Sequence, residues 1–326
     1  MKGLTEKGSG IGTKKKFRLI KIPRGGYERE KFKAFYVIMI PFLILFLAIR
    51  LYPLLWGMYI SFTNFTGFNL GELKMVGLNN YKRVFTDAEA LPSILRTIKI
   101  GLVTVPCSLV ISLTISMLLS QNRRGTGVFR TLIYLPSVLP MLAMTIMWRQ
   151  MYAYNGGLFN AILEGMGMEK INWFGYDYAY TALIIMMLCG STGGILGNIA
   201  AIKNVPTELY EAADIEGCGP FRKMIKITIP MISNILYMNI LMSIIGTLQL
   251  FAQPVFLAAQ SGASGDSLTS VPIEPLYTYL VHIYQQIFVN MRFGYGLALV
   301  WIIFIIIMFI TLVMEVTKRF WVFKED

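Results

Sequence analysis

The sequence predicts an all-α, polytopic membrane protein with six transmembrane helices. Of its 326 residues, 55% are hydrophobic and only 15% are charged, whereas about a quarter of the residues of a typical soluble protein are charged. A soluble chain of this length could not bury so much apolar surface. In addition, six stretches reach the roughly 20 apolar residues that a helix needs to cross the hydrocarbon core of a bilayer.

The six spans are expected to alternate across the membrane, so that both termini lie on the same side. The first span contains Arg50 and Pro53 and is expected to leave the membrane near them, and Arg130 lies at the entry of the third span. The second and fourth spans contain no charged residue. The predicted spans are residues 34–60, 100–119, 128–148, 178–202, 227–257 and 293–314.

The distribution of positive charge predicts the orientation. The formal net charge is +12, and with a cytoplasmic N-terminus 21 of the 30 Lys and Arg residues lie in cytoplasmic segments and seven in outer loops. Because cytoplasmic loops carry the excess of Lys and Arg, both termini are expected in the cytoplasm. A basic segment, residues 1–33, therefore precedes a transmembrane domain, residues 34–326. We expect this segment to set topology and contact anionic lipid rather than nucleic acid.

The sequence lacks the residues that several classes of protein need for their function. The second, fourth, fifth and sixth spans have no ionisable side chain between their ends, so an ion-coupled transporter would lack its carrier group. There is no GxxxxGK[ST] phosphate loop and no paired carboxylate, HExxH or nucleophile elbow for a membrane-embedded enzyme. We therefore assign no catalytic residue and expect energy to come from a partner. No metal or disulfide is expected from the isolated Cys107, Cys189, Cys218 and His282.

The connection between the fourth and fifth spans, residues 203–230, contains the clearest local pattern. Glu208 lies in the first turn of a predicted helix, where the helix dipole favours acidic residues. Gly217 and the pair Gly219-Pro220 would end that helix. A basic stretch, residues 222–226, then leads into the fifth span. We expect a short acidic helix, a tight turn and a basic helix at the membrane face.

This loop resembles the EAA loop of bacterial ABC-importer permeases, EAA-x3-G-x9-I-x-LP. Glu211-Ala212-Ala213, Gly217, Ile227 and Ile229-Pro230 match it, with isoleucine in place of leucine at 229. Further short stretches are similar to the carbohydrate-uptake branch, whose members include maltose-permease F-type and sugar permease A-type subunits. They are Tyr52-Pro53 with Ser61-Phe62, residues 76–81, Leu135-Pro136 with Pro140, and Gly156-Gly157-Leu158-Phe159-Asn160. The chain lacks the two extra N-terminal helices and the large outer domain of the maltose subunit.

The resemblance implies one subunit of a type I importer in a bacterial cell membrane. Such a machine contains two different permeases, two ATPase subunits and an external solute-binding protein. No cofactor is expected in this chain, because ATP and Mg²⁺ would bind to the ATPase subunits. The loop would dock into an ATPase cleft, with Glu211 as the principal charged contact to an arginine. The contact residues would be Glu208, Glu211, Ala212, Ala213 and Gly217.

The resemblance also implies a carbohydrate path, which needs amide and hydroxyl partners rather than buried charge. At about 100° per residue, six polar or small residues of the fifth span lie within about 80° of one direction. They are Asn239, Ser243, Gly246, Thr247, Gln249 and Gln253. Ser243 falls where the maltose subunit has a serine that contacts sugar. These groups could instead hydrogen-bond neighbouring helices. An oligosaccharide is the expected solute. Glycerol phosphate or an acidic sugar is the alternative; a basic residue lining the path would favour it, and none lies inside the spans, but Arg50 and Lys99 at the outer mouth keep it open.

Two further features remain open at this stage. Gly190, Gly193, Gly194 and Gly197 in the fourth span predict close helix approach, with a pore-lining role as the alternative. The outer stretch 258–292 contains aromatic residues between 277 and 288, which predict an interfacial helix with rings at the lipid headgroups. Contact with the binding protein is the alternative for this stretch. His282 is interpreted as structural.

Overall fold

The computed structural model describes residues 26–68, 71, 73–121, 125–190, 194–258 and 272–323. Regular structure in these ranges is helical apart from one isolated antiparallel bridge between Thr63 and Met75. This confirms the all-α prediction. The chain forms two compact units, Met1–Trp56 and Gly57–Asp326.

The first unit is described as one helical run. Helix α1 (Gly26–Phe46) passes through a π-helical turn (Leu47–Leu51) into α2 (Tyr52–Ser61). In that turn the N–H of Tyr52 bonds to the carbonyl of Leu47, five residues back. The helix therefore continues through Arg50 and Pro53, because the wider turn accommodates a proline that has no N–H to donate. The expected exit from the membrane near these residues stays a prediction.

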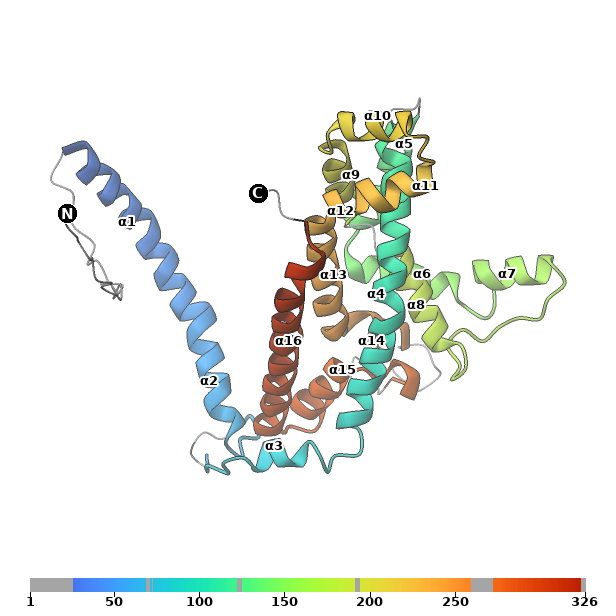
Figure 1. The fold of residues 1–326 in the computed structure, drawn as a ribbon. Helices are drawn as coiled ribbons and strands as arrows, with labels where there is room; N and C mark the ends of the chain where they lie inside the picture. Colours follow the sequence, from blue (N-terminus) through green and yellow to red (C-terminus); the bar gives the residue numbers. More distant parts are fainter. Residues whose placement is uncertain are drawn as a thin grey trace, which may run out of the picture. The chain divides into compact units, whose positions relative to one another are not determined.

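The helices of the second unit follow in the order shown in Figure 1. They are α3 (Asn79–Arg83), α4 (Ala90–Ser120), α5 (Thr126–Val138), α6 (Met141–Met151), α7 (Leu158–Gly165), α8 (Ala179–Gly190), α9 (Ile195–Lys203), α10 (Thr207–Ile215), α11 (Pro220–Lys223), α12 (Ile229–Met231), α13 (Ser233–Leu248), α14 (Ala252–Ala258), α15 (Tyr279–Tyr284) and α16 (Phe293–Trp321). Short π or 3₁₀ segments are Met224–Thr228, Glu274–Leu276 and Gln285–Val289.

Three continuous helices in the described ranges are long and apolar enough to cross a membrane: Glu30–Ser61, Ala90–Ser120 and Phe293–Trp321. Three bent pairs bring the number to as many as six. The bends are 100° between α5 and α6, 41° between α8 and α9, and 76° between Pro220–Met231 and α13. The α5 break follows from Pro140, since the residue before a proline is driven out of the helical region, and Leu139 is extended there (ψ 139°).

The fifth span is shorter than predicted. Helix α13 ends at Leu248, and Gln249 leaves the helical path with φ −98° and ψ 20°. A separate helix, α14, begins at Ala252. The prediction of one helix over 227–257 is wrong, because three consecutive helical pieces occupy that stretch.

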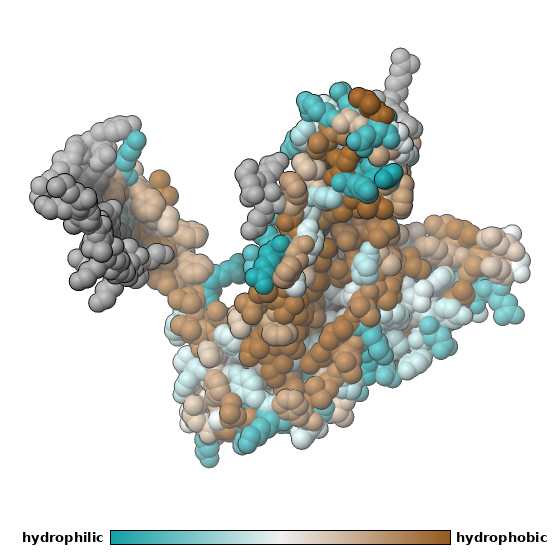
Figure 2. Space-filling view, in the orientation of Figure 1, coloured by the Kyte–Doolittle hydropathy of each residue, from teal (hydrophilic) through white to brown (hydrophobic). Residues whose placement is uncertain are grey.

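Helix α4 is central to the second unit and packs against α8, α9, α13 and α15. Its inward hydroxyls bond to carbonyls of their own helix, as Thr104 does to Ile100 at 2.8 Å. Ser116 bonds to its own helix and also to the carbonyl of Ile195 in α9, at 3.2 Å. Satisfied in this way, a hydroxyl can be buried at little cost. Figure 2 shows apolar residues over the long helices and hydrophilic residues gathered around α10 and α11.

The stretch around α15 lies inside the second unit rather than at its surface. Tyr279 and His282 are buried, and Tyr277 is nearly so. The hydroxyl of Tyr279 donates to the carbonyl of Leu299 in α16 at 3.1 Å. The interfacial-helix prediction is therefore wrong for these three residues, because they are buried, with Tyr279 bonded to α16 and the rings of Tyr277 and His282 bonded to each other at 3.1 Å. Phe288 alone of the aromatic residues between 277 and 288 is largely exposed.

Candidate functional site

The EAA-like loop forms the predicted helix, turn and helix. Pro206 precedes α10, and the acidic residue of its first turn is Glu208. The turn contains Gly217 at φ +69°, and the N–H of Cys218 bonds back to the carbonyl of Ala213 at 2.9 Å. This is the six-to-one bond of a Schellman end, which needs a residue with positive φ. Helix α11 then begins at Pro220.

Internal contacts hold this loop against the bundle. The hydroxyls of Tyr210 and Thr228 lie 2.9 Å apart, and Lys223 of α11 pairs with Asp214 of α10. Tyr210 also packs on Val205 and Ile232, where α9 and α13 meet the loop. Helix α10 is therefore joined by side-chain contacts to the start of α13.

The two faces of α10 differ. Ala213 is 7% exposed and lies on the inner face with Tyr210, one turn away. Ala213 is therefore packed inside this chain, and its contact with a partner stays a prediction. Glu208, Glu211 and Ala212 are exposed on the outer face, and Gly217, just beyond the end of α10, is exposed as well. Four of the five predicted contact residues are therefore accessible.

Two apolar side chains on this outer surface were missed from the sequence. Ile215 is 90% exposed and Phe221 is 70% exposed. Ile215 lies one helical turn after Glu211, and this i, i+4 spacing on an acidic helix was the available signal. The outer surface of the loop therefore carries two apolar side chains as well as carboxylates.

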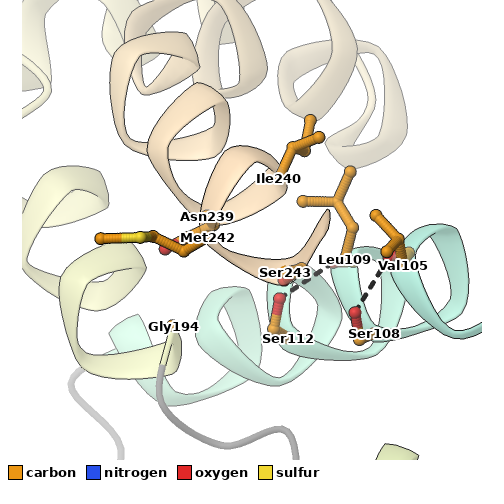
Figure 3. Close-up of a pocket in the computed structure, with 9 residues that line it drawn as sticks. All are labelled: Val105, Ser108, Leu109, Ser112, Gly194, Asn239, Ile240, Met242 and Ser243. Carbon is orange, nitrogen blue, oxygen red and sulfur yellow. Dashed lines mark hydrogen bonds between the residues drawn. The ribbon is translucent and has the colours of Figure 1, made fainter. Parts of the chain in front are cut away.

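A second candidate site is a cavity of about 390 Å³ between α4 and α13 (Figure 3). Asn239 and Ser243, two of the residues predicted for the solute path, line it from α13, and Ser108 and Ser112 line it from α4. The lining is completed by Val105, Leu109, Gly194, Ile240 and Met242. We call this the polar cavity. None of its lining residues is charged.

An asparagine pair closes one side of the polar cavity. The amide of Asn239 donates to Oδ1 of Asn198 in α9 at 2.8 Å. Asn198 is fully buried, and its own Nδ2 has no hydrogen-bond partner among the described residues. Asn198, Ser108 and Ser112 were not singled out from the sequence. The sequence feature that could have identified them is a polar side chain within a predicted span that has no charged residue.

The predicted polar stripe does not act as one surface. Thr247 is buried against Gly101 of α4, and its hydroxyl donates to the carbonyl of Ser243 at 2.9 Å. Gly246 and Gln249 are exposed, and Gln253 lies on α14 beyond the break. The structure thus brings only Asn239 and Ser243 of the six together in the cavity.

The predicted close approach of glycines holds at one position. A Cβ at Gly194 would lie 3.1 Å from the amide nitrogen of Asn239. Gly197 makes ordinary contact with Ile235, and Gly190 has nothing within 4 Å. Gly193 lies outside the described residues. Gly194 is therefore the glycine that admits Asn239 to the polar cavity.

Comparisons with known proteins identify the family of the chain. Residues 108–320 match the family described as binding-protein-dependent transport system inner membrane component. The chain is 30% identical over 323 residues, 98% of both chains, to the probable ABC transporter permease protein YesP of Bacillus subtilis. It is 28% identical over 287 residues, 87% of this chain and 93% of the relative, to the trehalose/maltose transport system permease protein MalF of Thermococcus litoralis.

The fold also matches a solved transporter. A chain of a bacterial alginate ABC transporter, crystallised with an alginate pentasaccharide-bound periplasmic protein, superposes with a TM-score of 0.73. The match covers 90% of this chain and 96% of that chain at 16% identity, so it shows the fold. The family is one of transport components, not of enzymes. The chain belongs to the binding-protein-dependent transport system inner membrane components, as a multi-pass ABC transporter permease.

Proposed function

We propose that this chain is one permease of an ABC importer that translocates a neutral carbohydrate, an oligosaccharide, delivered by an external solute-binding protein. The observation that carries the proposal is the polar cavity, which offers hydroxyl and amide groups and no charged side chain. Such a lining suits a molecule covered in hydroxyls. A glycerol phosphate or an acidic sugar would need a cation there. The trehalose/maltose permease named above agrees with a sugar substrate.

The proposed energy source is a pair of ATPase subunits that bind ATP and Mg²⁺ and dock on the outer face of α10. Glu211 would pair with an arginine of the ATPase, while Glu208 and Ala212 would border the contact. Tyr210 and Lys223 would pass the movement on to α13 through their internal bonds. A second, related permease would complete the path.

The proposed orientation places both termini and the coupling loop, residues 203–230, in the cytoplasm. The support for it is the charge distribution, 21 basic residues against seven. Residues 1–33 would lie against anionic lipid. A cysteine-accessibility assay in intact cells tests this. In a variant whose Cys107, Cys189 and Cys218 are replaced by alanine, Glu216→Cys should react with a membrane-impermeant maleimide only after lysis.

Reconstitution tests the function directly. The complete importer in proteoliposomes should hydrolyse ATP faster when a binding protein loaded with a neutral oligosaccharide is added, and should accumulate that sugar. An acidic oligosaccharide should not be accumulated. Equal uptake of both would contradict the neutral-substrate proposal, and no stimulation by any loaded binding protein would contradict the carbohydrate importer.

A further inference from the structure

A second pocket, separate from the polar cavity, is lined mainly by aromatic rings. It has a volume of about 440 Å³ and lies between the residues that follow α6, those that precede α8, and Ile273. Tyr154, Phe174 and Tyr176 supply its rings, and Asn172 supplies an amide. Tyr154 is 49% exposed and Tyr176 is 63% exposed. We call it the aromatic pocket.

The two long walls of the aromatic pocket are tied together by Asn160. Its side chain is 1% exposed and forms a network with backbone groups. Nδ2 donates to the carbonyl of Ile171 at 3.0 Å and, more weakly, to the carbonyls of Ala153 and Tyr154 at 3.4 and 3.3 Å. Oδ1 accepts from the N–H of Ile171 at 3.0 Å. A single buried amide thus fixes the spacing between Tyr154 and Asn172.

Asn160 ends the Gly156-Gly157-Leu158-Phe159-Asn160 motif, and its neighbours serve the same construction. Gly156 has φ +75°, and a Cβ on Gly157 would overlap the backbone of Ala153. Phe159 stacks on Tyr152 with ring centroids 4.9 Å apart, and Tyr152 contacts Phe174 edge-on at 6.5 Å. The motif therefore supports two residues of the pocket lining, Ala153 through the close approach of Gly157 and Phe174 through Tyr152.

The third wall is fixed by an ion pair. The hydroxyl of Tyr176 donates to Oε2 of Glu274 at 3.3 Å, and the other carboxylate oxygen of Glu274 lies 3.0 Å from Arg96 of α4. Ile273, next to Glu274, is thereby held on the pocket edge. Rings that are already held in place lose little conformational entropy when a ligand binds.

The lining identifies the chemistry of the ligand. A pyranose ring presents apolar C–H groups on its faces, which pack on aromatic faces, and hydroxyls on its rim, which bond to amides. The Asn172 side chain makes no hydrogen bond within the described part of the chain, so both its groups can serve a ligand. The nearby charges are already paired, Lys170 with Glu164 at 3.1 Å and Glu274 with Arg96. Lys170 also lies over the Tyr154 ring, 5.8 Å from its centroid, but its charge is already paired with Glu164, which favours a neutral sugar over a carboxylate.

We propose that the aromatic pocket is a binding site for a neutral sugar ring, which Tyr154 and Tyr176 stack against and Asn172 hydrogen-bonds, and that Asn160 is its positioning residue. The inference rests on the proposed function, since in the proposed orientation these loops lie on the outer side. The site would hold one ring of an oligosaccharide as it leaves the binding protein, before the polar cavity is reached.

Saturation-transfer NMR on the complete importer in nanodiscs tests the site without a binding protein. The probes are maltotriose, cellotriose and arabinotriose, with trigalacturonate as the acidic comparison. At least one neutral trisaccharide should receive saturation. Its affinity should fall about tenfold in Tyr154→Ala/Tyr176→Ala, from the loss of two stacking contacts.

Three variants guard against a folding artefact. Asn172→Ala truncates an exposed side chain and should also weaken binding, while Tyr154→Phe keeps the ring and should bind like the parent. Phe85→Ala removes an aromatic ring that is 75% exposed outside the pocket and should change nothing. The proposal is overturned if no neutral trisaccharide binds, or if affinity is the same in the parent, the double variant and Asn172→Ala. If ATPase stimulation by every loaded binding protein is absent although a trisaccharide binds, the importer proposal fails and the site stands.

Discussion

The carboxylate of Asp87, just before α4, lies 3.5 Å from Nε2 of His282 in α15. The hydroxyl of Tyr277 lies 3.1 Å from the other ring nitrogen, and that of Tyr295 in α16 donates to Asp87 at 2.7 Å. The prediction that His282 has no acidic partner is therefore wrong, although its structural role agrees with this burial. The network joins the loop before α4 to α15 and α16.

This network predicts a pH dependence of stability. Burial lowers the pKa of His282, although Asp87 and Glu89 act in the opposite direction. A histidine with a lowered pKa stays neutral in the folded state, so unfolding takes up a proton once the pH falls below about 6.5. The free energy of unfolding should therefore decrease from pH 7.5 to pH 5.5 by at most about 1.4 kcal/mol per pH unit. This decrease should be measurable as a lower melting temperature of the importer. His282→Gln should flatten this slope, and an unchanged slope would contradict the assignment.

Gly217 should be intolerant of any side chain. Its φ of +69° costs a β-branched residue about 1–2 kcal/mol locally, and Gly217→Val should misplace the turn between α10 and α11. We expect the variant to reach the membrane but to lose most uptake in a transport assay. Gly219→Ala is the matched control, because Gly219 has φ −67° and open space around its Cα. Normal uptake by Gly217→Val would remove the turn from the coupling mechanism.

Ile215 should contribute to ATPase docking. An exposed isoleucine that becomes buried at an interface contributes about 2 kcal/mol, so Ile215→Asp should weaken copurification of the ATPase subunits by at least tenfold. Ile215→Leu keeps the apolar volume and should copurify normally. Equal recovery of ATPase with both variants would place the contact elsewhere.

Ser243 and Thr247 should respond differently to loss of the hydroxyl. Ser243 lines the polar cavity, so Ser243→Ala should raise the KM of uptake several-fold, by the loss of about one hydrogen bond. Thr247 is buried and bonds within its own helix, so Thr247→Val should leave KM unchanged. If the two variants show the same KM, the polar cavity is not on the solute path.

Asn239 should support the fold as well as the cavity. Asn239→Ala would leave Oδ1 of the buried Asn198 without its donor, at a cost of about 1–3 kcal/mol. Asn234→Ala, at an exposed position of the same helix, is the control. A thermal-shift assay should show a lower melting temperature only for Asn239→Ala, and equal melting temperatures would mean that the amide pair adds no stability.

The coupling loop was predictable because its signals are local. Glu208 in a first turn, Gly217 at a positive φ and Pro220 at a helix start each follow from the backbone preferences of neighbouring residues. The inward face of Ala213 was not predictable in the same way. It depends on Tyr210 packing where α9 and α13 meet, and those helices are distant in sequence from one another.

The polar stripe shows the limit of periodicity. The spacing correctly placed Asn239 and Ser243 on one side of α13, because α13 is regular over that stretch. The spacing did not place Gln249 and Gln253 correctly, because α13 ends at Leu248. An angle of 100° per residue applies only within one continuous helix. Nothing in the local sequence distinguished Ser243 from Thr247, whose hydroxyl is consumed by its own helix.

The sequence by itself determined that this chain spans a membrane, that its spans carry almost no charge, and that residues 203–230 form a helix, a turn and a second helix. These properties depend on composition and on contacts between near neighbours. Only the tertiary structure decided that Asn198 meets Asn239, that Asp87 meets His282, and that Asn160 holds an aromatic pocket open. Each of those pairings is set by how separate segments pack, and the free energy of burying a polar group depends on which partner the fold brings to it.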